Sequence, residues 1–116
     1  MKSLQRFSKI YFHRETVDFR KGINGLSAIV EYDMQLDPFE DALFVFTNSN
    51  KNKIKALYWD NTGFALWMKS LITDRYKWPV HLESEVVLVD VSKLEKLLVG
   101  YNPFQIKFKK KKFSKV

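Results

Sequence analysis

The chain has 116 residues, a net charge of +7 and no cysteine. This length suits one domain, and a composition that is 46% hydrophobic with ten phenylalanines supplies enough apolar surface for a core. The lack of cysteine excludes disulfides and thiolate zinc sites, and no stretch approaches the roughly 20 apolar residues of a membrane span. Lys2, Arg6 and Lys9 interrupt the apolar residues near the N-terminus, so we expect no signal peptide and a cytoplasmic protein.

The first predicted elements are a strand and an amphipathic helix. Over residues 9–14, apolar positions alternate with a period of two, which indicates a strand. From Asp18 the period lengthens to that of a helix, which we expect over about 18–33 with Asp18 as its N-cap. Its apolar face would carry Phe19, Ile23, Leu26 and Val30.

A β-hairpin is expected in the middle of the chain. Residues 42–47 and 53–59 are rich in β-forming residues, and the polar segment 48–52 between them reads as a turn. A second turn at 60–63 leads to residues 64–71, which fit a third strand. A helical period also fits residues 64–72, so strand and helix both remain open there.

The last part of the domain predicts two short strands and a helix. Residues 75–80 resemble an edge strand that ends near Pro79, and residues 85–89 form a β-branched run. Residues 92–99 fit a helix with a capping box that starts at Ser92, and Gly100 ends it.

Together these elements predict a single α+β domain over residues 1–104. We expect a mainly antiparallel sheet of about five or six strands, with both helices on one face of it. Residues 105–116 form a lysine-rich segment that we expect to be a flexible tail.

Catalytic patterns are missing from the sequence. Neither His13 nor His81 lies in a metal-binding or catalytic spacing, and no phosphate-cradling glycine loop follows a strand. Each candidate aspartate stands at a predicted turn or helix start, where it has a local bonding role: Asp18, Asp37, Asp60, Asp74 and Asp90. We therefore expect no catalytic residue, no metal, no cofactor and no small-molecule substrate, with a small metal-dependent nuclease as the less favoured alternative.

Basic and aromatic residues gather in the predicted hairpins. On a sheet, cations can follow phosphates while exposed rings stack on bases. Equally, the rings can form an ordinary core, and lysines can protect a sheet edge. The cations are Lys51, Lys53, Lys55, Lys69, Arg75 and Lys77, and the rings are Tyr58, Trp59, Trp67, Tyr76 and Trp78.

Most of the net charge comes from the end of the chain. Residues 1–99 are nearly neutral, with 14 basic and 13 acidic side chains, whereas the tail adds six lysines and no acid. Such an arm can neutralise DNA phosphates; an acidic protein face, anionic lipid or simple solubility are alternatives. The candidate binding residues in this arm are Lys109, Lys110, Lys111 and Lys112.

A signature stretch and five later blocks of the sequence resemble one known family in order and spacing. The stretch Val17-Asp18-Phe19-Arg20-Lys21-Gly22-Ile23-Asn24-Gly25-Leu26 is similar to the D-M-R-K-G-x-D-G-L signature of the TnpB accessory proteins, the second open reading frame of the insertion-sequence sixty-six family. The later blocks are Asp37-Pro38-Phe39, Leu43-Phe44-Val45-Phe46, Lys53-Ile54-Lys55-Ala56-Leu57-Tyr58-Trp59-Asp60, Gly63-Phe64-Ala65-Leu66-Trp67 and Tyr76-Lys77-Trp78-Pro79. The resemblance covers about residues 10–80.

The chain departs from the family pattern at several positions. Ser49 and Ser70 stand where the family typically has arginine, and Asp74 stands where it has glycine. Phe19 and Asn24 replace a methionine and an aspartate. The two missing arginines weaken a nucleic-acid surface around the hairpins.

The resemblance implies a bacterial protein that assists transposition beside a separate, larger transposase. Its expected partners are that companion transposase and DNA at the element ends, and it has no catalytic residue of its own. Arg20 and Lys21, on the polar face of the expected helix, are the first candidates for such contacts. A general nucleic-acid-binding module for RNA or single strands, acting through Tyr58, Trp59, Trp67 and Trp78, remains the alternative.

Overall fold

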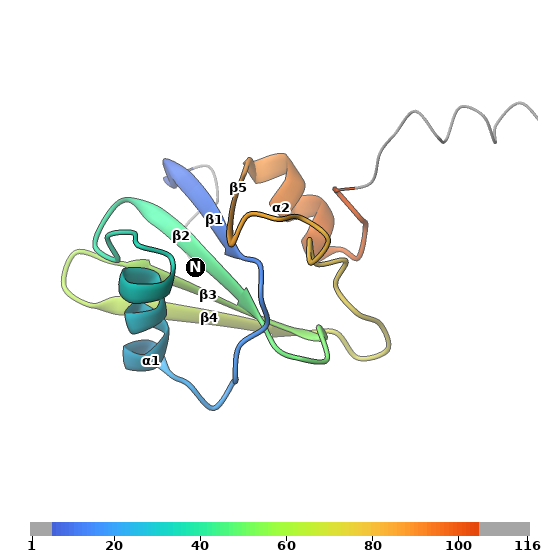
Figure 1. The fold of residues 1–116 in the computed structure, drawn as a ribbon, viewed down its shortest axis with the longest axis horizontal. Helices are drawn as coiled ribbons and strands as arrows, with labels where there is room; N and C mark the ends of the chain where they lie inside the picture. Colours follow the sequence, from blue (N-terminus) through green and yellow to red (C-terminus); the bar gives the residue numbers. More distant parts are fainter. Residues whose placement is uncertain (1–5, 105–116) are drawn as a thin grey trace, which may run out of the picture.

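A five-stranded sheet forms the centre of the structure, a computed structural model that describes residues 6–104 (Figure 1). The strand order is β4-β3-β2-β1-β5. β1 pairs in parallel with β2, while the other three pairings are antiparallel. The predicted α+β class with a mainly antiparallel sheet is therefore confirmed. The strands are β1 (Lys9–His13), β2 (Ala42–Thr47), β3 (Lys53–Trp59), β4 (Phe64–Ser70) and β5 (Val86–Val89).

The predicted hairpin is confirmed, and the segment after it, left open between strand and helix, is a strand. β2 pairs with β3, and β3 pairs with β4 along the whole of β4, from Trp59 opposite Phe64 to Lys53 opposite Ser70. This pairing decides between strand and helix for residues 64–70. A seven-residue strand that pairs throughout satisfies its backbone groups on one side and places Trp67 opposite Ala56.

The helices cover opposite faces of the sheet, so the expectation that both lie on one face is wrong. α1 (Ile23–Ala28) and the π-helical turn η2 (Ile29–Asp33) pack on the face that carries Tyr11 and Phe44. α2 (Val91–Leu98) packs on the face that carries Phe12. All of β2 and nearly all of β1 are buried, so other elements must pack on both faces of these central strands.

The first helix begins five residues later than predicted. Asp18 does not cap it; its Oδ1 instead accepts the backbone N–H of Arg20 at 2.9 Å, within a turn before the helix. Gly22 is the N-cap, without a side-chain cap. At Gly25, a Cβ atom would lie 3.0 Å from the Lys21 Cβ, so the glycine leaves room for that side chain. The local bonding of Asp18 therefore holds this segment in a turn, and the helix begins only after it.

The C-terminal helix begins one residue earlier than predicted. Asp90, rather than Ser92, is its N-cap, and Asp90 Oδ1 accepts the N–H of Lys93 at 2.8 Å. Gly100 has a φ of +99°, and its N–H donates to Leu97 O, which ends the helix as expected. No helix within residues 6–104 is long and apolar enough to cross a membrane.

The predicted edge strand at residues 75–80 is wrong. This segment is an irregular loop in which Tyr76 and Trp78 are buried. The Trp78 ring stacks on Phe12 with centroids 4.8 Å apart, and its Nε1 donates to His13 O at 3.1 Å. The rings anchor the loop to the core, which explains its strand-like composition. The predicted tail, residues 105–116, lies outside the described residues.

Candidate nucleic-acid or partner interface

Three loops meet at the end of the sheet where β1, β2 and β4 finish (Figure 1). The loop after β1 joins the end of β2, because Val17 N–H donates to Thr47 O at 2.9 Å. The segment after β4 joins the β2–β3 turn, because Leu71 N–H donates to Asn52 O and Tyr76 N–H to Lys51 O. Segments 14–22, 48–52 and 71–77 therefore form one surface.

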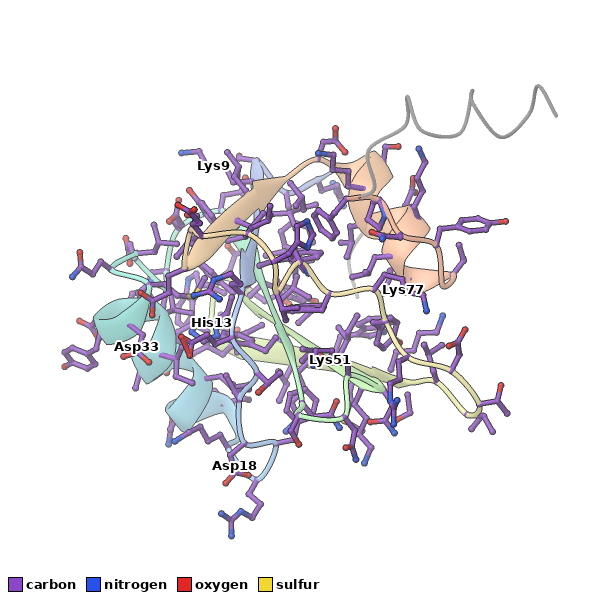
Figure 2. All side chains as sticks on the ribbon, turned by 45° about the vertical axis from the view of Figure 1, so that its right-hand side comes forward. Lys9, His13, Asp18, Asp33, Lys51 and Lys77 are labelled. Atoms are coloured by element: carbon purple, nitrogen blue, oxygen red, sulfur yellow. The ribbon has the colours of Figure 1, made fainter. Side chains whose placement is uncertain are left out.

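The β2–β3 turn is held in one shape by the side chain of Asn48. Its Oδ1 accepts the N–H groups of Asn52 and Lys53, and its Nδ2 donates to Asn52 Oδ1 at 2.7 Å. Lys51 adopts a φ of +57° at the tip of the turn. The turn therefore holds the backbone of Lys51 in place, and the Lys51 carbonyl accepts the N–H of Tyr76, which precedes Lys77; both lysines are labelled in Figure 2.

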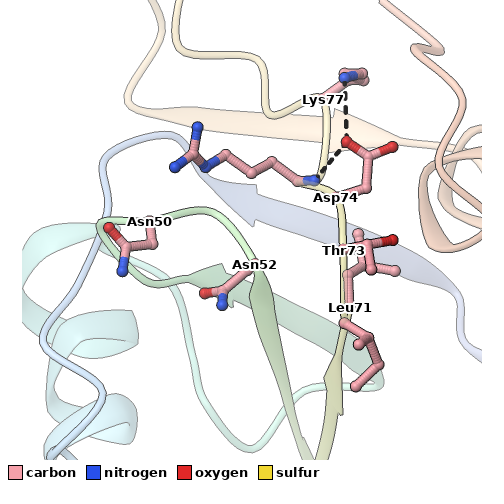
Figure 3. Close-up of a pocket in the computed structure, with 8 residues that line it drawn as sticks. Asn50, Asn52, Leu71, Thr73, Asp74 and Lys77 are labelled. Carbon is pink, nitrogen blue, oxygen red and sulfur yellow. Dashed lines mark hydrogen bonds and ion pairs between the residues drawn. The ribbon is translucent and has the colours of Figure 1, made fainter.

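An open hollow of about 540 Å³ lies beside this turn (Figure 3). Asn50 and Asn52 line one side of it, and the segment from Leu71 to Lys77 lines the other. Arg75 and Lys77 supply two cations, while Asp74 Oδ1 lies 3.9 Å from Lys77 Nζ and also accepts Arg75 N–H. Amide donors and cations together suit an anionic group, and Asp74 offsets part of that positive charge.

A second hollow, of about 560 Å³, lies on the other side of the turn. It is lined by Asn48 and Ser49 from the turn and by residues 16–20 from the loop after β1. Arg20 is almost fully exposed there and holds Asp18 through Nη2–Oδ2 contact at 2.6 Å and two further bonds from Nε. Arg20 is thus partly committed to Asp18 and lies before the helix rather than on its polar face.

This ion pair lowers the pKa of the Asp18 carboxyl. The side-chain hydrogen bonds from Arg20 lower the pKa of the Asp18 carboxyl from 3.8 to about 2. Because the folded pKa lies below the unfolded one, the pair favours the folded loop above about pH 4, and this contribution is lost as the pH falls toward 2. We expect a carboxyl NMR titration of Asp18 with a midpoint near 2, and Arg20→Gln should return it toward 3.8. A wild-type midpoint near 3.8 would show that the pair is absent in solution.

Two of the predicted binding cations, Lys55 and Lys69, make hydrogen bonds that stabilise the fold instead. Lys55 Nζ donates to Phe19 O at 2.9 Å and to Lys21 O at 3.0 Å, and lies 4.8 Å from the centre of the Phe19 ring. Lys69 Nζ donates to Leu98 O at 3.1 Å, at the C-terminal end of α2 where a cation is favourable. These lysines lie on opposite faces of the sheet, as alternate positions of paired strands require.

Five of the predicted cations share the loop end of the sheet. Lys53 starts β3 directly after the turn, whereas Lys21 lines a separate hollow together with Glu15, Asp18 and Asp33. We therefore leave Lys21 out of the group. We call the remaining set the basic end: Arg20, Lys51, Lys53, Arg75 and Lys77. The predicted cations at 109–112 lie outside the described residues.

Most of the predicted stacking rings belong to the core. Tyr58, Tyr76 and Trp78 are only 6%, 2% and 4% exposed. Trp67 is half-buried against the core on the α2 face, and Trp59 is half-buried among other rings. A surface that stacks several bases is therefore not formed by these five side chains, which removes the main support for a single-strand-binding module.

The candidate acids and histidines mostly have local roles. Asp18, Asp37 and Asp74 accept backbone N–H groups within two residues, and Asp90 accepts the N–H of Lys93, three residues on. His13 is buried, with Nδ1 2.8 Å from Glu15 O, and His81 is exposed. Among the described residues, no group of three or more His, Asp or Glu side chains is arranged to hold a metal ion.

Sequence reasoning missed a second distinctive surface at the opposite end of the sheet. There, Phe39 packs against Trp59 and Phe64 with centroids 5.0 and 5.4 Å apart, and Asp37 and Asp60 flank the rings. The signal was present in the sequence, because no lysine or arginine lies between positions 22 and 50 or between 56 and 68. Each aspartate was assigned only to its own turn, so their grouping was not seen.

Comparison with known proteins places the chain in a family. It is 34% identical over 71 residues to "Uncharacterized protein y4jC" of Sinorhizobium fredii, a match that covers 61% of each chain. It is 30% identical over 83 residues to "Uncharacterized protein y4hO" of the same organism, covering 72% of this chain and 71% of the relative. No solved structure matches the chain. A model of the IS66 Orf2-like proteins matches residues 8–108, and the chain belongs to this IS66 Orf2-like family.

Proposed function

We propose that this protein is a non-catalytic accessory protein of DNA transposition that helps a separate transposase by contacting the DNA backbone through its basic end. Membership of the IS66 Orf2-like family supports the role in transposition. The observation that supports the DNA contact is the convergence of three loops, which brings cations from distant parts of the chain to one end of the sheet.

The geometry of the basic end favours phosphate contacts over base reading. Lys51, Arg75 and Lys77 stand on two adjoining loops beside the amides of Asn50 and Asn52. Such side chains neutralise phosphates and position a protein on a duplex without reading its sequence. In this proposal the transposase supplies recognition of the element ends, and the accessory protein adds affinity.

The lysine-rich segment at 105–116 adds to this contact. Its six lysines carry no acidic neighbour, and each phosphate contact by such a side chain releases counterions. The segment therefore contributes DNA affinity that falls steeply as the salt concentration rises. The basic end determines the orientation of the domain on the duplex. Contact with the companion transposase completes the proposed assembly, and the protein works in the bacterial cytoplasm.

A transposition assay tests the role as a whole. An element whose copy of this reading frame carries a stop codon should transpose much less often than the intact element, and the wild-type protein supplied in trans should restore the frequency. A supplied Lys51→Gln/Arg75→Gln/Lys77→Gln protein, present at the same level, should restore it poorly. Equal transposition with and without the protein would contradict the accessory role.

A further inference from the structure

The end of the sheet opposite the basic end carries a partly exposed aromatic cluster, in which Phe39 is exposed and Trp59 and Phe64 are half-buried. The Phe39 side chain is 57% exposed, although its ring packs edge-on against Trp59 and tilted against Phe64. Trp59 and Phe64 themselves meet with centroids 5.1 Å apart. The three rings thus form one continuous apolar patch, and contiguous exposed apolar patches are candidate binding surfaces.

Acidic residues adjoin these rings in the sequence. Asp37 and Glu40 flank Phe39 on the loop before β2, and Asp60 directly follows Trp59 in the β3–β4 turn. Lys9 at the start of β1 is separated from Trp59 by the whole width of β2. We call this surface the acidic aromatic end: Phe39, Trp59, Phe64, Asp37, Glu40 and Asp60.

The chain itself contains a segment of complementary chemistry. Residues 105–116 read Gln-Ile-Lys-Phe-Lys-Lys-Lys-Lys-Phe-Ser-Lys-Val, in which Phe108 and Phe113 bracket four consecutive lysines. Lysine ammonium groups are attracted both to carboxylates and to the faces of aromatic rings, and the two phenylalanines add edge-to-face partners for the exposed cluster. We infer that the acidic aromatic end binds segment 105–116 of a second copy of this protein.

The position of Phe104 favours a second copy over the same molecule. The Phe104 ring lies 6.0 Å from Phe12, on the α2 face of the sheet, whereas Phe64 packs on the α1 face. Lys112 is eight residues beyond Phe104, so a fully extended chain carries it at most about 28 Å. Within one molecule that path has to pass around the sheet, but a neighbouring molecule meets no such obstacle.

This contact joins two different surfaces and so links copies head to tail. It does not depend on the DNA contact proposed above, because no residue of the acidic aromatic end belongs to the basic end. DNA and the second copy do compete for the same lysine-rich segment. Excess duplex DNA should therefore dissociate the assembled copies.

Charge-exchanged variants of the full chain test the inference by sedimentation velocity. Glu40→Lys/Asp60→Lys changes the surface, and Lys110→Glu/Lys111→Glu changes the segment; neither Glu40 nor Asp60 makes a side-chain bond in the described structure. Wild-type protein should self-associate at about 50 mM salt and dissociate at about 500 mM. Each variant alone should associate at least tenfold more weakly, whereas an equimolar mixture of the two should form a mixed dimer.

The mixture is the decisive measurement, because in it an intact segment on one chain can bind an intact surface on the other. Glu83→Lys/Glu95→Lys makes the same charge change at exposed sites elsewhere and should associate like wild type. Wild-type protein that stays monomeric at low salt would overturn the inference, and so would a mixture that stays monomeric. Unchanged thermal unfolding of each variant excludes misfolding as the cause.

Discussion

Replacing Lys51, Arg75 and Lys77 with glutamine should lower the affinity for duplex DNA by about 100- to 1,000-fold at low salt. Each lost phosphate contact removes the release of about one counterion, which at about 50 mM salt is worth on the order of tenfold in affinity. The three side chains stand on the β2–β3 turn and the adjoining loop. Fluorescence anisotropy with a labelled duplex measures the change.

A matched triple variant controls for net charge. Lys9, Lys93 and Lys96 are exposed and do not belong to the basic end, so their replacement with glutamine removes the same charge from other positions. This control should bind DNA within about threefold of wild type. Asp74→Asn, which removes the acid beside Lys77, should instead raise the affinity. Equal losses in both triple variants would show that only the overall charge matters.

Replacing Trp78 with alanine should destabilise the domain by about 3–5 kcal/mol. The indole is 4% exposed, stacks on Phe12 and donates its Nε1–H to His13 O, so truncation leaves a cavity and an unpaired carbonyl. A domain of this size has about 5–15 kcal/mol of stability in total. Chemical unfolding followed by circular dichroism measures the loss.

A conservative variant, Trp78→Phe, distinguishes a structural role of the Trp78 ring from a role in base stacking. Trp78→Phe keeps a ring against Phe12 but loses the hydrogen bond to His13 O, and should cost about 1 kcal/mol with unchanged DNA affinity. Should Trp78→Ala leave stability intact and abolish binding to single strands, the ring would be a ligand contact and the general nucleic-acid-binding hypothesis would regain its support.

Local patterns predicted the strands well, because alternation and turn chemistry are short-range signals. The Asn48-to-Asn52 turn and the Asp60-to-Gly63 turn lie where polar clusters interrupt β-forming runs. The placement of the two helices was not predictable in the same way. Ile10 and Phe12 alternate with Tyr11 and His13 along β1, yet all four are buried, and only the packed structure shows that β1 has two covered faces.

Sequence also could not separate binding lysines from structural ones. Lys51, Lys53 and Lys55 look equivalent along the chain, yet Lys55 bonds to Phe19 O, 36 positions away. The same limit applies to Tyr76 and Trp78, whose aromatic, β-like composition predicts a strand although the rings fill the core from a loop. Contacts between distant segments decide these cases, and one sequence carries no record of them.

The salt dependence of DNA affinity tests the central claim most directly. Plotting the logarithm of the association constant against that of the salt concentration gives a slope set by the number of phosphates contacted. If the basic end touches the backbone, the slope of the Lys51→Gln/Arg75→Gln/Lys77→Gln variant should be shallower than that of wild type by about 2 to 3. Identical slopes would contradict the claim and leave the lysine-rich segment as the whole of the DNA contact.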